Sequence, residues 1–443
     1  MARKVFVSFL GTNNYLNTHY KLNGEVSKPV RFIQDALIDF ICKEWTENDL
    51  ILIFCTGGEN GSEKLNWFDN GHTRFNESEN LERVGLQTII NNKNLNAQVS
   101  NEIIPEGFSE DEIWNIFDIV YEQLEENDEI YFDVTHAFRS IPMFSTVLFN
   151  YAHFMKNTHV KSVLYGAFEK LGPAYKVKEM DLEKRVAPVI DLSNMIKLQE
   201  YSEMASSLIT FGRVNRISDV LKDGNDSDSI IKQICEAIEN FDNYIVANRM
   251  SEIKKGKIIC TIKNNVKAIR KTDLPIPIKN VIRRLGEDLK EFVCGDSNQN
   301  IEAAINWAVK YKMLPQAYTM GQEYIISLLF EILEDKNPYQ DKEKSKRKRK
   351  FRMFLSSLCA VSEEDIQKEK LKDTLSEHRD LTYSLLKNDT VIKLRKYYPD
   401  LSERRNAIDH AKGNVEYKEL EEKFVELYSN CIKVLKPNVD QPD

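Results

Sequence analysis

The sequence contains no apolar run long enough to span a bilayer, and its basic start is followed by too short an apolar stretch for a signal peptide. None of its seven cysteines forms a CxxC pair, so neither a zinc site nor a disulfide framework is predicted. The net charge of −8 excludes a chain that is basic as a whole. We therefore expect a cytoplasmic protein with reduced thiols and no metal, which contacts nucleic acid only through local patches.

The 443 residues are 42% apolar and 29% charged, which is typical of a globular protein of two or three domains. Strand-like and helix-like stretches alternate in the first part of the chain. The predicted strands are 4–10, 49–55, 129–132 and 161–168, with a weak strand at 97–104 and an edge hairpin at 173–180. The predicted helices are 30–45, 81–91, 111–124 and 141–154. This alternation predicts right-handed crossovers and a mostly parallel α/β sheet of Rossmann-like type.

Three of these strands run into turns of small and polar residues, namely Gly11–Tyr15, Thr56–Gly61 and Asp133–Arg139. Parallel strands end at one edge of a sheet, where ligands bind, and glycines and free helix amides there suit a phosphate. No GxGxxG follows the first strand, and the second turn lacks the GK[ST] ending of a P-loop. The alternative is that these are ordinary tight turns and a capped helix.

The edge of the predicted sheet supplies side chains that can hydrogen-bond a base, a ribose or a phosphate. The third turn contributes Asp133, Thr135, His136 and Arg139. The other two turns add Asn13, Thr56 and Gly57 as candidate ligand-binding positions.

From residue 194 onward, long amphipathic stretches predict an all-α region. The predicted helices are 194–221, 229–249, 258–269, 278–293, 301–313, 314–334, 351–360, 368–386 and 417–434. The part up to residue 299 is most simply a helical connector, although a DNA-reading helix-turn-helix is an alternative. The charged run Asp341–Arg352 is either a solvated surface loop or a patch for RNA phosphates.

Arg405 and His410 lie within a further helical stretch, Leu401–Ala411. Five residues separate them, so they are about 140° apart around an ideal helix and do not share a face. A two-fold dimer can build a single cleft by setting two copies of such a helix against each other. Histidine can transfer protons near neutral pH, and arginine can hold a phosphate, so the pair suits metal-independent RNA cleavage through the 2′-hydroxyl. The alternative is a lone histidine and an exposed arginine on an ordinary helix.

Taken together, these motifs resemble those of the ancillary effectors of type III CRISPR systems, in which a CRISPR-associated Rossmann fold (CARF) precedes a HEPN ribonuclease domain. Asp133-x-Thr135-His136 is similar to the family's Asp-x-Thr-His-Gly element, with Ala137 in place of its glycine. Gly11-Thr12 matches its other ligand-facing turn, and Arg405-Asn406-x3-His410 matches the HEPN Arg-x4-His motif. The resemblance covers essentially the whole chain.

The resemblance implies a CARF domain at 1–193, a connector at 194–299 and a HEPN domain at 300–443. It implies a homodimer whose CARF pair binds cyclic oligoadenylate, most commonly the tetra-adenylate, and so activates a composite single-stranded RNase in antiviral defence. Carried over residue by residue, the catalytic residues are Arg405, Asn406 and His410. The ligand-facing residues are Gly11, Thr12, Asp133, Thr135, His136 and Ala137.

Two other functions stay open at this point. One is a nucleotide-sensing regulator without catalysis, and the other is an enzyme that only degrades the cyclic nucleotide. Ala137 bears on the second, because alanine does not tolerate a positive φ as glycine does.

Overall fold

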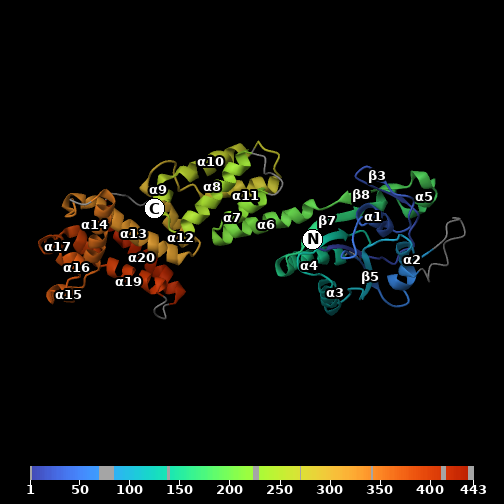
Figure 1. The fold of residues 1–443 in the computed structure, drawn as a ribbon, viewed down its shortest axis with the longest axis horizontal. Helices are drawn as coiled ribbons and strands as arrows, with labels where there is room; N and C mark the ends of the chain where they lie inside the picture. The colour runs from blue at the N-terminus through green and yellow to red at the C-terminus, as the bar shows by residue number, and fades with distance from the viewer. Residues whose placement is uncertain are drawn as a thin grey trace. The chain divides into compact units, whose positions relative to one another are not determined.

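The computed structural model describes residues 2–68, 84–136, 140–222, 229–269, 271–340, 343–410 and 416–437. The chain forms two compact units, Met1–Gln199 and Glu200–Asp443 (Figure 1). The first is an α/β unit and the second is helical, which confirms the predicted fold class. The division of the helical part at residue 299 stays a prediction.

A single eight-stranded sheet forms the centre of the first unit, in the order β3-β2-β8-β7-β6-β1-β4-β5. The strands are β1 Lys4–Phe9, β2 His19–Leu22, β3 Glu25–Val26, β4 Leu50–Thr56, β5 Gln98–Ile104, β6 Glu129–Asp133, β7 His159–Gly166 and β8 Val186–Asp191. β1 pairs in parallel with both β4 and β6, and β5 and β7 extend this parallel block on either side. The ends of β1, β4 and β6 therefore lie at one edge, as the three polar turns predicted.

Helices cover both faces of the sheet because the strands are apolar on both sides. The helices are α1 Ile33–Ile41, the π-helical turn η1 Glu63–Trp67, α2 Leu86–Asn91, α3 Glu110–Glu122, α4 Ser140–Lys156, η2 Phe168–Leu171, α5 Ala174–Lys178 and η3 Leu182–Lys184. Phe6 packs in the core beside α1 and α2, whereas its neighbours Val5 and Val7 pack in the core beside α3 and α4. Alternate residues of this buried central strand therefore pack into the cores on opposite faces of the sheet.

Two parts of the strand prediction for this unit need correction. The predicted edge hairpin at 173–180 is wrong, because that segment contains α5 and the antiparallel neighbour of β7 is β8. The hairpin of β2 and β3 was missed. Its sequence signal is Asn23-Gly24, where both residues have positive φ (49° and 95°), as a two-residue hairpin turn requires.

The second unit is built from helices alone in the part of the chain that the structure describes. They are α6 Asn194–Phe211, which begins in the first unit, α7 Asn215–Lys222, α8 Ser229–Val246, α9 Met250–Lys255, α10 Lys257–Ile269, α11 Ile276–Asp288, α12 Asn298–Lys310, α13 Leu314–Ile332, η4 Glu334–Lys336, α14 Lys344–Ala360, α15 Glu363–Gln367, α16 Asp373–Ser376, α17 Arg379–Leu386, α18 Asp389–Leu394, α19 Tyr398–Asp409 and α20 Tyr417–Leu435. One continuous apolar core joins them, with α13 packed against α12, α14, α19 and α20.

Some predicted boundaries in this unit were wrong. The helix expected at 194–221 is interrupted at Gly212, which has a φ of 62° and leaves no room for a Cβ beside the ring of Tyr311. Most of the charged run at 341–352 is the first half of α14 and not a loop. The helix expected at 368–386 is divided into α16 and α17.

The prediction that all seven cysteines are reduced is also wrong. Cys260 of α10 and Cys294, which follows α11, form a disulfide with their Cα atoms 5.0 Å apart. The 34-residue separation carries no sequence signal, and only the packing of α10 against α11 brings the two thiols together. Across the described ranges, no helix has the length and apolar character needed to cross a membrane.

Candidate functional sites

The turn after β6 is held by a network centred on the buried carboxylate of Asp133. One of its oxygens accepts from the Ser8 hydroxyl at 2.7 Å, and the other accepts from the Thr135 amide and hydroxyl at 3.0 and 2.5 Å. The Thr135 hydroxyl in turn accepts from the Gly166 amide at 2.9 Å. Burial raises the pKa of Asp133, while the hydrogen bonds from Thr135 and Ser8 act in the opposite direction. Asp133 therefore braces the turn across β1, β6 and β7 rather than facing the cavity described below.

The turn after β1 approaches the β6 turn so closely that only glycine fits at position 11. A Cβ there would lie 2.2 Å from the hydroxyl of Tyr15 and 2.9 Å from the carbonyl oxygen of His136. Asn66 of η1 holds this turn from the other side, since its amide donates to the carbonyls of Gly11 and Asn13 at 2.7 and 3.0 Å. Sequence reasoning missed Asn66, because an asparagine in a separate segment gives no signal of this contact.

The turn after β4 is held by hydrogen bonds between residues at its two ends, Thr56 and Ser62. The Thr56 amide donates to the Ser62 hydroxyl, and the Ser62 amide donates to the Thr56 hydroxyl, each at 2.9 Å. Thr56 is buried, and neither Thr56 nor Gly57 lines the cavity described next. The role of this turn in ligand binding stays a prediction.

A cavity of about 600 Å³ opens at the sheet edge between the β1 and β6 turns and the segment that follows β7. Its lining residues are Asn13, Asn14, Tyr15, Leu16, Tyr20, Thr135, His136, Tyr165, Gly166, Phe168, Glu169, Gly172, Pro173 and Ala174. The volume lies within the range of small-molecule sites. The cavity brings together three of the predicted ligand-binding residues: Asn13, Thr135 and His136. Gly11 and Thr12 adjoin it in sequence without lining it.

His136 lines this cavity and has a strongly lowered pKa. Its ring packs against that of Tyr15 with centroids 4.1 Å apart, and burial lowers its pKa to about 4. Its Nε2 and the Tyr15 hydroxyl are buried without a hydrogen-bond partner among the described residues. Two polar atoms buried in this way beside a cavity are suited to a ligand that supplies their partners.

The far side of the cavity carries a pair that sequence reasoning missed. The Tyr165 hydroxyl donates to Glu169 at 2.8 Å, and burial together with this carboxylate raises the pKa of Tyr165 to about 12. Glu169 is the only charged side chain among the described lining residues. The two residues are four apart in sequence, with Tyr165 near the end of β7 and Glu169 in η2. Ala137 and Arg139 lie outside the described residues.

The second predicted site lies at the end of α19. Arg405 is part of the helix, and its Nε is 3.0 Å from a carboxylate oxygen of Asp409, while its Nη1 donates to the Asn406 side chain at 3.1 Å. His410 is the C-cap residue, and its amide bonds the Asn406 carbonyl at 3.0 Å. The imidazole of His410 is exposed. A single chain thus holds an arginine oriented by two neighbours and a histidine open to solvent.

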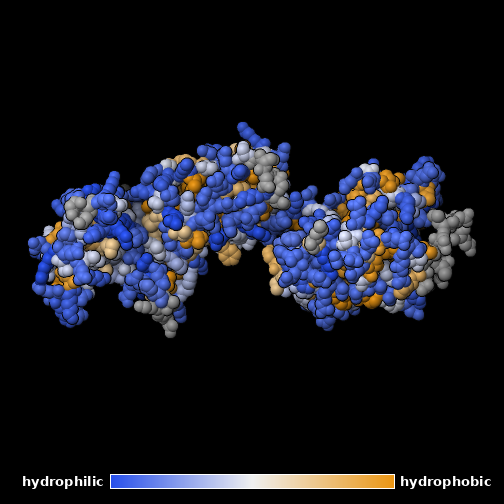
Figure 2. Space-filling model, in the orientation of Figure 1, coloured by the Kyte–Doolittle hydropathy of each residue, from blue (hydrophilic) through white to orange (hydrophobic). Residues whose placement is uncertain are grey.

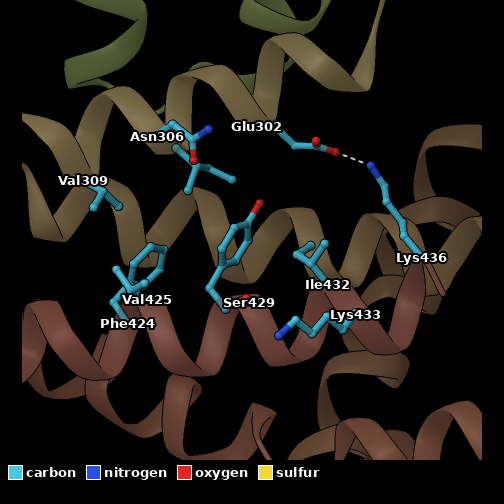
Figure 3. Close-up of a pocket in the computed structure, with 11 residues that line it drawn as sticks. Glu302, Asn306, Val309, Phe424, Val425, Ser429, Ile432, Lys433 and Lys436 are labelled. Atoms are coloured by element: carbon cyan, nitrogen blue, oxygen red, sulfur yellow. Dashed lines mark hydrogen bonds and ion pairs between the residues drawn. The ribbon is translucent and has the colours of Figure 1, made fainter. Parts of the chain in front are cut away.

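A separate cavity of about 400 Å³ lies between α12 and α20, away from this motif (Figure 3). Its walls include Val309, Phe424 and Ile432, and at one end Glu302 forms an ion pair with Lys436 and accepts from Tyr324. The carboxylate of Glu302 is therefore already neutralised from within the protein.

Comparison with known proteins bears on the first unit above all. Residues 5–169 match the family described as the CARF domain of the CRISPR system endoribonuclease Csx1. The chain is also 26% identical over 315 residues to the CRISPR-associated protein MJ1674 of Methanocaldococcus jannaschii, which covers 70% of this chain and 46% of that protein. The chain thus spans about half the length of this curated relative.

These matches confirm the CARF domain and the expected resemblance to the CARF-containing proteins of type III CRISPR systems. The CARF match ends at residue 169 and therefore does not include α19. The HEPN assignment of the helical unit and the roles of the individual site residues stay predictions.

Proposed function

We propose that this chain is a single-stranded RNA endoribonuclease of type III CRISPR defence that is activated by cyclic oligoadenylate and needs no metal. The observation that carries the proposal is the presence, in one chain, of two features. One is a CARF cavity with two buried polar atoms that have no hydrogen-bond partner among the described residues, and the other is a helix whose last turn and C-cap hold Arg405, Asn406 and His410. The cavity size and its apolar and aromatic walls suit part of a nucleotide ring, with a second CARF copy completing the site.

The chemistry at α19 begins with proton removal from an RNA 2′-hydroxyl by His410. The 2′-oxygen bonds to phosphorus as the bond to the 5′-oxygen breaks, and the partner subunit's His410 protonates that leaving oxygen. The products are a 2′,3′-cyclic phosphate and a 5′-hydroxyl end. Arg405 offsets the charge that develops on the phosphate, and Asn406 orients Arg405 through the 3.1 Å hydrogen bond between them.

The proposed homodimer is supported by an exposed apolar stripe on α4. Val147, Tyr151, Phe154 and Met155 are 65%, 45%, 59% and 58% exposed and follow one another at spacings of four, three and one. At 3.6 residues per turn these positions lie on one face of the helix. In Figure 2, hydrophobic side chains gather where α4 reaches the surface of the first unit. Contiguous apolar surface of this kind is typical of an interaction site, here with a second copy of the chain.

The test is cleavage of labelled single-stranded RNA in EDTA, with no activator, with cyclic tetra-adenylate and with cyclic hexa-adenylate. We expect cleavage with one ring only, and none in His410→Ala, which should still bind the ring. Glu403→Ala is the matched control, because Glu403 is an exposed residue of the same helix and forms no ion pair with any residue that the structure describes. Undiminished cleavage by His410→Ala would refute the catalytic assignment, and loss of the ring with intact RNA would favour a ring-degrading enzyme.

A further inference from the structure

The first half of α14 carries seven lysines and arginines within nine positions: Lys344, Lys346, Arg347, Lys348, Arg349, Lys350 and Arg352. All of them are exposed except Arg347 and Arg352, which are half-buried. They stand in a chain with a net charge of −8, so the cluster opposes the overall charge. Figure 2 shows a largely hydrophilic surface around α14. We call these residues the basic stripe.

The basic stripe breaks two rules of helix stability. Cations are unfavourable in the first turn, because the helix dipole is positive there, and α14 has no acidic residue in that turn. Like charges four residues apart repel each other, and Lys344, Lys348 and Arg352 form two such pairs in succession. The N-cap Glu343 makes no side-chain capping hydrogen bond. Local rules broken in this way are expected at functional sites, and a bound polyanion relieves both penalties.

The described surroundings neutralise only part of the stripe. Arg352 pairs with Glu323 at 2.5 Å, and Lys346 pairs with Glu343 at 3.3 Å. Lys344, Lys348 and Arg349 form no ion pair with any described residue. These three cations are therefore available to a partner.

The helix that carries the basic stripe is anchored in the apolar core of the second unit. Phe351, which lies between Lys350 and Arg352 in sequence, is fully buried and packs against Phe330 of α13, with ring centroids 5.6 Å apart. Near its other end α14 contacts α19, where the Ser356 and Tyr398 hydroxyls are 2.9 Å apart. The cations are on the first half of α14, and Arg405 is near the end of α19. Neither the cations nor Arg405 therefore lies at the contact between the two helices.

We propose that the basic stripe of α14 binds the phosphates of the RNA substrate at a distance from the scissile bond. This rests on the proposed function, which supplies single-stranded RNA as the partner. Cations four residues apart on a helix are about 6 Å apart along its axis, a separation comparable to that of successive phosphates in an extended strand. The stripe thereby favours long strands over short ones without touching the reacting atoms.

The test uses the full chain carrying His410→Ala and loaded with the activating ring, so that RNA binds without being cut. The test variant adds Lys344→Gln, Lys348→Gln and Arg349→Gln. The control variant instead adds Lys232→Gln, Lys267→Gln and Lys290→Gln, which are exposed lysines elsewhere in the unit with the same total charge change. Glutamine removes like-charge repulsion, so α14 is expected to stay folded, and circular dichroism checks this.

The readout is the slope of log affinity against log salt concentration for a long single-stranded RNA. Each phosphate contact contributes about 0.7 to this slope, so we expect it to fall by about 2 in the test variant and to be unchanged in the control. With His410 restored, the test variant should raise KM for long RNA, with kcat and the cleavage of a short strand unchanged.

An unchanged slope in a test variant whose parent binds RNA overturns the assignment of the stripe and leaves the ribonuclease proposal intact. An equal loss in the control variant also overturns it, since the effect is then one of overall charge. Competition by polyglutamate as strong as that by RNA would assign the stripe to acidic polypeptides instead. Failure of the wild-type chain to cleave or bind RNA with any ring would refute the proposed function itself.

Discussion

The lowered pKa of His136 makes the stability of the CARF domain depend on pH. Burial lowers this pKa from 6.5 to about 4. Between pH 6.5 and pH 4, His136 is therefore protonated in the unfolded chain but neutral in the folded chain. The free energy of unfolding therefore falls as the pH falls through this window, and the stabilising contribution is fully present only above about pH 6.5. At 1.36 kcal/mol per pKa unit, the complete loss is about 3 kcal/mol. Between pH 7 and pH 5 the loss is about 1.8 kcal/mol.

The assay is equilibrium unfolding in urea at pH 7 and pH 5, for the wild type and for His136→Asn. Tryptophan fluorescence reports mainly on the first unit, which contains Trp45, Trp67 and Trp114, whereas the second contains Trp307. Asparagine does not titrate, and groups common to both proteins cancel in the difference between them. The stability of the wild type relative to His136→Asn should therefore fall by about 1.8 kcal/mol on going from pH 7 to pH 5. Parallel pH profiles, with a change below about 0.5 kcal/mol, would refute the burial of a neutral His136.

Three further predictions concern residues whose surroundings the structure defines. Gly11→Ala should weaken binding of the activating ring by about tenfold or more in calorimetry, because its Cβ has no room. The control is Gly286→Ala in the helical unit, which meets only the Val266 side chain at 3.1 Å and should bind the ring normally; equal effects of the two substitutions would contradict this. Asp133→Asn should lower the free energy of unfolding, measured in urea, by about 2 kcal/mol. The Ser8 and Thr135 hydroxyls both donate to Asp133, so the NH2 group of an asparagine would face a donor and leave one hydrogen bond unmade. Unchanged stability would show that the network is dispensable. Arg405→Lys should lower kcat for RNA by about 100-fold with ring binding intact, because a lysine lacks the planar fork that bonds Asn406 while holding the phosphate; full activity would remove Arg405 from the mechanism.

Local patterns in the sequence determined most of the first unit. The apolar runs of β1, β4 and β6 are continuous because both sheet faces are buried, so they could be recognised without knowledge of their neighbours. The polar turns that end them could be assigned to one sheet edge, because parallel connections leave no other arrangement. The segment at 173–180 could not be assigned in this way, since a short apolar stretch after a strand suits either a hairpin or a single helical turn.

What each residue of the site does was decided by the tertiary structure. The sequence placed Asp133 and His136 three positions apart in one turn, and both were candidates to meet a ligand. The fold directs Asp133 inward to Ser8, where its hydrogen bonds are used within the protein, and leaves the buried Nε2 of His136 without a described partner. Asn66, which holds the β1 turn, comes from a segment whose contact with that turn exists only after folding.

In the helical unit, too, some features follow from local sequence and others only from packing. Sequence alone located the Arg405-x4-His410 motif and the charged run near residue 350, because both are local. Only the packed structure made that run a helix, since burial of Phe351 and Phe354 against the core outweighs the repulsion between its cations. Only packing joined Cys260 to Cys294 across 34 residues. Side-chain pattern specifies local conformation, whereas the partners of a buried polar or charged group depend on chain segments that meet only in the folded protein.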